Sequence, residues 1–284
     1  MSKTRIRLAL VALLLSSLAV AQGGDNDKIW REFMDWARTQ TGGLVIAGYR
    51  AKLLESGLTA AQADERIALI PKLYEQNHEY REQMDALTFD KLYRDRNQTR
   101  FTAEPNAFLI SAIKDVKPGK ALDVAMGQGR NAVYLATKGW DVTGFDVAEE
   151  GLKVANENAA KAGVTITTLK ARLEDFDYGA ARWDLICLIY VDAPIVDPGF
   201  IARIGAALKP GGLALIDHPF RSLTDPEPGW VETEQDKVNA LAKAWSDFQI
   251  VFYEDTTGIA EWQQTADARL NHKVRIVRLL ARKL

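Results

Sequence analysis

A glycine-bearing turn between an apolar strand and a helix is the feature that most constrains this fold. The run LDVAMGQG at 122–129 ends a short apolar segment, and a helical pattern begins near Asn131. Gly127 and Gly129 let the backbone approach a ligand closely, and the helix presents its free N–H groups to the turn. Open α/β sheets bind ligands at such turns, beyond the carboxyl ends of their strands. The turn therefore predicts an α/β fold with a binding site at residues 122–129.

The sequence that follows residue 120 repeats this alternation of strand and helix. Such alternation is typical of βαβ units and of a mostly parallel sheet. The expected strands are 121–124, 142–146, 166–170, 183–190, 212–217, 249–253 and 273–281. The expected helices between them are 131–138, 148–162, 197–208 and 234–248.

The first residues read as a targeting segment. Basic residues at 3, 5 and 7 precede the apolar run 8–15, and small residues at 19 and 21 end it. These three features together predict a secretory signal peptide at residues 1–21, with a buried N-terminal helix as the alternative. The apolar run is too short for a stable membrane anchor. We therefore expect an exported protein, periplasmic or secreted, with no stable membrane anchor after cleavage.

Residues 22–87 have a helical pattern and few chemically reactive side chains. An apolar stripe at i, i+4 and i+7 begins at Ile29. Thr59 and Gln62 form a capping-box signature that opens a further helix, and we expect Pro71 to end or kink that helix. This segment is interpreted as a helical N-terminal cap.

Composition excludes several classes of protein. Hydrophobic residues make up 47% of the 284 residues, which is enough for a sizeable core and excludes a disordered chain. The formal charge of −2 provides no basic field for nucleic acid, so no nucleic-acid partner is expected. The single cysteine, Cys187, lies in an apolar strand and is interpreted as a buried small hydrophobe. Three scattered histidines lack metal-ligand spacing, so no metal site is expected.

Two carboxylates narrow the choice of ligand. Alone, the sequence GQGRNA at 127–132 also fits a nicotinamide-cofactor turn. Asp123, just before the turn, would repel a pyrophosphate and attract an amino-acid ammonium. Asp146, which ends the second expected strand, can accept hydrogen bonds from a ribose diol. The pair favours a ligand with both an amino-acid and a nucleoside part.

These motifs together resemble the class I S-adenosylmethionine (SAM)-dependent methyltransferases. The residues concerned are 123–129, Asp146 and the LKPGG turn at 208–212. Three further segments, FDKLY at 89–93, EPNAFL at 104–109 and GRNAVYL at 129–135, are similar to the tellurite-resistance and thiopurine methyltransferase-like branch. The resemblance implies a methyltransferase domain at 88–284. Its fold would be a Rossmann-like seven-stranded sheet of order 3-2-1-4-5-7-6, mostly parallel, with strand 7 antiparallel.

The resemblance also implies a set of residues that bind SAM. Four residues of the turn would hold the methionine part of SAM. Asp146 would bind the ribose and Val147 would pack on the adenine. Glu174 or Asp175 would meet the adenine amine, and Ile189 would line the sulfonium. The four turn residues are Asp123, Ala125, Gly127 and Gly129. Two positions depart from the family pattern: Ala125 replaces the first glycine of the turn, and Arg172 stands where an acid commonly meets the adenine amine.

Candidate catalytic residues are few. His218 and Tyr190 end two neighbouring expected strands, and either could assist an acceptor by taking its proton. So few bases favour a small, soft acceptor such as a thiol or a chalcogen anion, since these need little base assistance. Two alternatives stay open: an exported SAM- or nucleoside-binding protein without catalysis, and an NAD(P)-dependent oxidoreductase.

Overall fold

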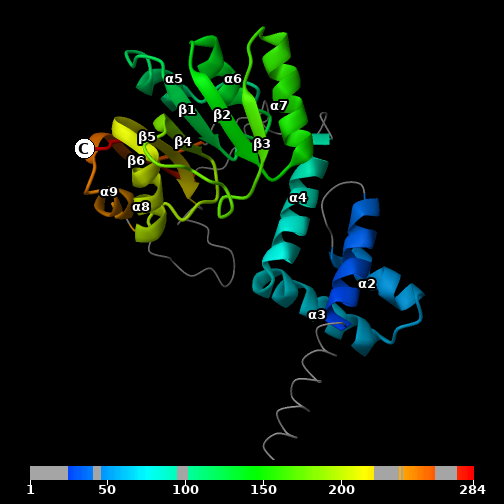
Figure 1. Ribbon diagram of the computed structural model, residues 1–284. Helices are drawn as coiled ribbons and strands as arrows, with labels where there is room; N and C mark the ends of the chain where they lie inside the picture. Colours follow the sequence, from blue (N-terminus) through cyan, green and yellow to red (C-terminus); the bar gives the residue numbers. More distant parts are fainter. Residues whose placement is uncertain (1–24, 41–45, 95–101, 221–236, 238, 260–273) are drawn as a thin grey trace, which may run out of the picture. The chain divides into compact units, whose positions relative to one another are not determined.

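The computed structural model describes residues 25–40, 46–94, 102–220, 237, 239–259 and 274–284 (Figure 1). Its chain divides into two compact units, Met1–Lys91 and Leu92–Leu284. The signal peptide predicted at residues 1–21 lies outside the described residues.

The first unit is helical. A helix over residues 25–39 precedes α2 (Ile46–Glu55), α3 (Ala60–Gln76) and α4 (His78–Arg94), the last of which crosses the boundary between the units. Trp30 stacks on Tyr80 with ring centroids 4.6 Å apart, within a buried aromatic cluster. The predicted capping box at Thr59 and Gln62 is confirmed. Of the two alternatives predicted for Pro71, ending the helix is excluded, because α3 continues to Gln76 with Ile70 and Leu73 buried on either side of the proline.

The second unit is built on the predicted seven-stranded sheet (Figure 1). Its strands are β1 (Lys120–Val124), β2 (Asp141–Asp146), β3 (Thr167–Lys170), β4 (Trp183–Ile189), β5 (Leu208–Phe220), β6 (Gln249–Gly258) and β7 (Val274–Arg282). Their order is β3-β2-β1-β4-β5-β7-β6, and β7 pairs antiparallel to both its neighbours. The predicted order and direction of the strands are therefore confirmed.

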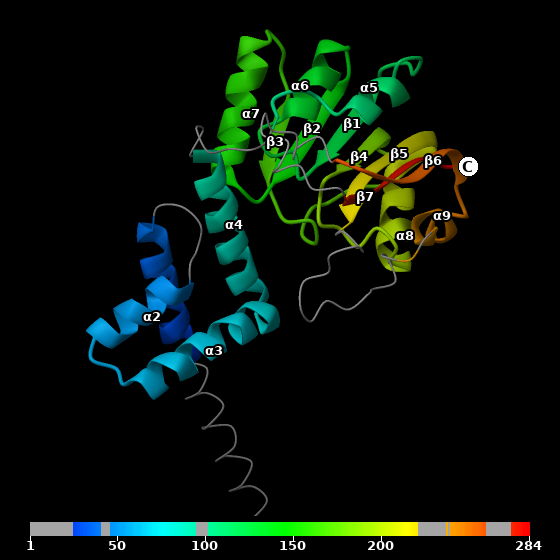
Figure 2. The ribbon, with the colours of Figure 1, turned by 180° about the vertical axis from the view of Figure 1, so that it is seen from behind.

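Helices cover both faces of this sheet (Figure 2). One face packs against α5 (Ala107–Ala112), α6 (Arg130–Thr137) and α7 (Glu149–Lys161). The other packs against α8 (Pro198–Ala207) and α9 (Ala240–Ala244). Alternation along β5 explains this, because Leu213 and Leu215 face the first group of helices whereas Ala214 and Ile216 face the second. Cys187 is fully buried in the core, as predicted.

Two predicted elements had the wrong extent. The helix expected at 234–248 is described only as α9, which ends at Ala244, and Trp245 and Phe248 pack into the core beyond it. Strand β5 is 13 residues long and includes the predicted turn at 209–211, because Gly211 and Gly212 bond the main chain of Lys283 next to β7.

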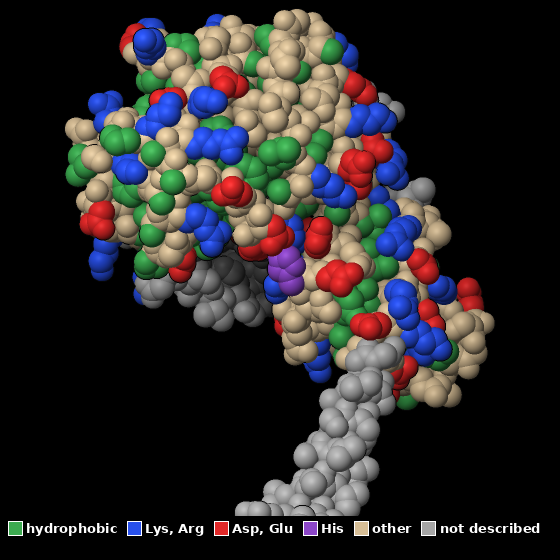
Figure 3. All heavy atoms as spheres, in the orientation of Figure 1, with side chains coloured by type: hydrophobic (Ala, Val, Ile, Leu, Met, Phe, Trp, Pro, Cys, Tyr) green, Lys and Arg blue, Asp and Glu red, His purple; other side chains and the backbone are tan. Residues whose placement is uncertain are grey.

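The surface of the described residues carries both signs of charge. Acidic and basic side chains are interspersed over the face drawn in Figure 3. Among the described residues, no helix combines the length and apolar character needed to cross a bilayer.

Candidate active site

The glycine turn joins β1 to α6 at the carboxyl edge of the sheet. Ala125, Gly127 and Gly129 all have left-handed backbones, with φ of 53°, 53° and 75°. Ala125 thus keeps the conformation for which a glycine is normally chosen, at a strain of about 1–2 kcal/mol for an L-residue. The residue is exposed.

Both glycines of the turn allow close approaches that a side chain would prevent. A Cβ on Gly129 would lie 2.7 Å from the Cβ of Ala155 in α7. A Cβ on Gly127 would collide with the hydroxyl of Tyr93, whose ring also packs on Gly151. The tyrosine from the FDKLY segment thus lies directly on the turn.

Asp146 holds the turn from the end of β2. One carboxylate oxygen accepts the Gly127 N–H at 2.8 Å and the other accepts the Ala148 N–H at 2.9 Å. The residue is buried, so these charge-assisted bonds fix the turn against the second strand.

Asp123 lies beneath the turn and is buried, with 2% of its surface exposed. It accepts the main-chain N–H of Ala132 in the first turn of α6. Among the described residues its Oδ2 has no hydrogen-bond partner. Burial raises the pKa of the carboxyl to about 7, against the lowering effect of Arg130. An ammonium group placed here would satisfy the orphaned oxygen, so the site fits the amino-acid part of SAM.

The residues expected around the adenine lie after β2 and β3. Val147 is half-buried, and Glu174 and Asp175 are exposed. Arg172 has only 10% of its side chain exposed, and its Nε donates to Glu174 at 3.3 Å. Glu174 thus neutralises the arginine that replaces the usual acid.

The two catalytic candidates lie against different halves of the core. Tyr190 follows the buried Ile189 and has φ 56°, a strained conformation for a bulky residue. Its ring lies 5.5 Å from the Arg130 guanidinium and packs on the α5–α7 side. His218 makes an edge contact with Phe220, whose ring belongs to the α8–α9 side.

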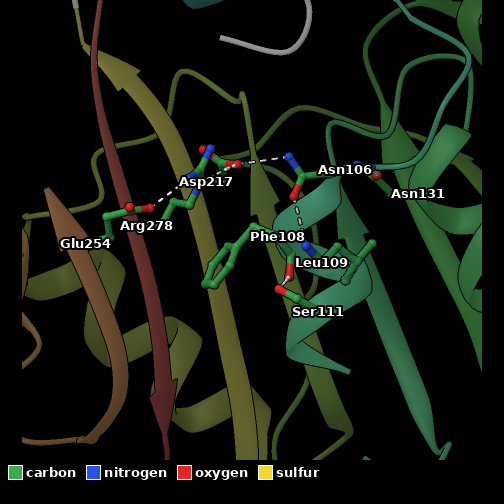
Figure 4. A network of polar contacts seen from close by, with 8 residues as sticks. All are labelled: Asn106, Phe108, Leu109, Ser111, Asn131, Asp217, Glu254 and Arg278. Carbon is green, nitrogen blue, oxygen red and sulfur yellow. Dashed lines mark hydrogen bonds and ion pairs between the residues drawn. The ribbon is translucent and has the colours of Figure 1, made fainter. Parts of the chain in front are cut away.

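The structure also brings together residues that the sequence did not single out. Asn106, Asp217 and Arg278 form a polar network at the same end of the sheet (Figure 4). The sequence signal for this network was Asp217, an acidic residue near the end of an apolar strand. The sequence favours its neighbour His218 as the candidate residue instead. Among the described residues no group of His, Cys, Asp and Glu could hold a metal ion.

Comparison with known proteins agrees with this geometry. Residues 121–212 match the family described as methyltransferase domain. The chain is 26% identical over 184 residues to a protein of Haemophilus influenzae described as probable S-adenosyl-L-methionine-dependent methyltransferase TehB. This similarity covers 62% of the chain and 61% of that relative, which is less than two thirds of its length. A ubiquinone biosynthesis O-methyltransferase of Methylobacterium nodulans is 36% identical over 105 residues, covering 36% of the chain and 42% of the relative.

The solved structures extend the likeness to the fold. The crystal structure of TehB from Haemophilus influenzae superposes with a TM-score of 0.52 at 24% identity, covering 69% of this chain and 66% of that one. Dinucleotide-binding sheets have the order 3-2-1-4-5-6, without the antiparallel strand inserted here between β5 and β6. The second unit therefore has the fold of the class I SAM-dependent methyltransferases, and residues 121–212 match a methyltransferase domain. Over part of its length the chain is similar to TehB, and SAM is the cofactor of the class.

Proposed function

We propose that the protein transfers a methyl group from SAM to a small, soft nucleophile such as a thiol or a chalcogen anion. The observation that carries the proposal is the pair of buried carboxylates at the glycine turn. One of them, Asp123, has an orphaned oxygen suited to an ammonium, and the other, Asp146, fixes the turn beside it. Bound SAM supplies an electrophilic methyl group on its sulfonium.

We further propose how the domain's residues divide the binding of SAM. Asp123 binds the ammonium, and the backbone of the turn from Ala125 to Gly129 lies along the methionine part. Asp146 accepts from the ribose, Val147 packs on the adenine, and Ile189 lies beside the sulfonium. Glu174 or Asp175, in the exposed turn after β3, meets the adenine amine.

The chemical class of the methyl acceptor is inferred from the side chains near the ends of β4 and β5. The main task of the domain is to align the acceptor with the methyl group and exclude water. An ionised chalcogen needs no base, whereas a thiol must lose its proton first. His218 is half-buried at the end of β5 and is the candidate base for that step. Tyr190, which follows β4, is the second candidate.

The experiment is transfer of labelled methyl from SAM into a panel of acceptors. Alkyl thiols and hydroselenide should be labelled, and phenols and simple amines should not. Labelling of phenols alone would overturn the soft-acceptor proposal and favour oxygen methylation. Tight SAM binding with no labelled acceptor would favour the non-catalytic binding protein.

Export is a separate proposal, carried by the sequence at residues 1–21 alone. Expression of the full chain in a bacterium, followed by N-terminal sequencing, should give a protein that begins at Gln22. A cytosolic protein that retains residues 1–21 would contradict the signal peptide.

A further inference from the structure

A chain of polar contacts crosses the sheet from β6 to the start of α6 (Figure 4). Glu254 accepts from Nη1 of Arg278 at 2.7 Å, and Nε of Arg278 donates to Oδ2 of Asp217 at 3.3 Å. The same Asp217 oxygen accepts from Nδ2 of Asn106 at 2.9 Å. The main-chain N–H of Asn106 donates to Oδ1 of Asn131, also at 2.9 Å. Side chains up to 111 residues apart in sequence are thus joined in one line.

The central residues of this network are buried, so their hydrogen bonds allow one arrangement of the side chains. Asn106 and Asp217 are fully buried, and Asn131 is 6% exposed. The Oδ1 of Asn106 caps α5 by accepting the Leu109 N–H at 2.9 Å, so its Nδ2 must point away from that helix. An ionised carboxylate only accepts hydrogen bonds, so Asp217 selects this orientation of the amide. Misplacing either group would leave a buried polar atom unsatisfied.

The inner end of the network reaches the cofactor turn. Asn131 is the second residue of α6 and lies two positions after Gly129. The next residue, Ala132, donates its main-chain N–H to Asp123. Fixing Asn131 therefore fixes the backbone that both ends the glycine turn and bonds the buried carboxylate.

We propose that Asp217 is a positioning residue for the cofactor turn, acting through Asn106 and Asn131. The inference rests on the proposed function in one respect, that this turn binds SAM. Asp217 itself needs no contact with the cofactor. Its carboxylate orders the turn from β5, on the acceptor side of the domain, and the ordered turn binds SAM more tightly.

The decisive variant is Asn106→Asp, which keeps the size of the side chain and the cap of α5. It places a carboxylate oxygen against Asp217, so the attraction becomes repulsion. We expect SAM binding, measured by calorimetry, to weaken about tenfold. We also expect faster hydrogen–deuterium exchange at residues 126–133 without SAM. The double variant Asn106→Asp with Asp217→Asn again gives one donor facing one acceptor between these two positions. Because the amide nitrogen at 217 cannot accept from Arg278, the double variant should recover part of the affinity and protection.

Ser111→Ala is the matched control, since it removes a contact to the Phe108 carbonyl on the same helix, outside the network. It should leave SAM affinity and exchange at 126–133 unchanged. If Asn106→Asp does not fold, Asn131→Ala tests the same link from the other side and should speed exchange at 126–133. Faster exchange confined to α5, with wild-type SAM affinity, would overturn the positioning role. Failure of the wild-type protein to bind SAM would instead refute the proposed function.

Discussion

Asp123 makes SAM binding depend on pH in a direction that can be worked out. In the free protein, burial raises the pKa of its carboxyl to about 7, so the group is largely protonated at pH 6. A cofactor ammonium favours the ionised form and lowers this pKa, so binding must release the proton. With a pKa of about 7, the release is about 0.9 proton at pH 6 and about 0.5 at pH 7. Below pH 7 the affinity should fall by up to about tenfold for each pH unit.

The assay is calorimetric titration of SAM between pH 5.5 and 7.5, in buffers of different ionisation enthalpy that report the protons released. Asp123→Asn cannot ionise, so its affinity should be lower at pH 7.5 and nearly independent of pH. Affinity that is constant over this range, with no proton released by the wild-type protein, would refute the assignment of Asp123 to the ammonium.

The same carboxyl affects stability in the free protein. Its folded-state pKa is raised above the unfolded value, so its contribution is fully present below about pH 4 and is lost as the pH rises toward 7. The loss is on the order of 4 kcal/mol for a group this deeply buried. Comparing urea unfolding of the wild-type protein and Asp123→Asn at pH 5 and 7.5 isolates it. An equal pH dependence in both proteins would contradict the raised pKa.

Three further predictions concern single side chains. Asp146→Asn leaves the N–H of Gly127 or Ala148 without its acceptor. The free energy of unfolding, measured in urea, should therefore fall by about 2 kcal/mol, and SAM should bind at least about tenfold more weakly. Wild-type values for both measurements would contradict the role of Asp146. Ala125→Gly relieves about 1–2 kcal/mol of left-handed strain but costs about 0.4–1 kcal/mol in chain entropy, so unfolding should show a net gain of up to about 1.6 kcal/mol. A clear loss of stability would argue against that strain. His218→Ala should lower turnover of an alkyl thiol at pH 7 by roughly a hundredfold and leave that of hydroselenide unchanged; equal turnover of the thiol would remove His218 as a base.

Local sequence patterns predicted most of the fold. The bounds predicted for strands β1, β2 and β4 agree with the structure within one residue, because each strand is a short, largely buried segment between turns. Where tertiary contacts outweigh local pattern, the predictions were wrong. The helix predicted to reach residue 248 ends at Ala244, and Trp245 and Phe248 pack into the core beyond it.

The site could be predicted from the sequence only where its residues lie close together in the chain. The glycine turn and its two carboxylates lie within 24 residues, at strand ends that the apolar pattern marks. The link from Asn106 through Asp217 to Arg278 depends on the register of β5 against β7, which pairs Asp217 with Arg278. No spacing in the sequence fixes that register. The contact of Tyr93 with Gly127 likewise depends on where α4 ends in space.

The central claim, that the turn at 122–129 binds SAM, is tested most directly by equilibrium dialysis of labelled SAM against the purified protein. We predict saturable binding to one site, displaced by unlabelled S-adenosylhomocysteine and unaffected by NAD. Absence of binding at millimolar SAM, or displacement of the label by NAD, would contradict it.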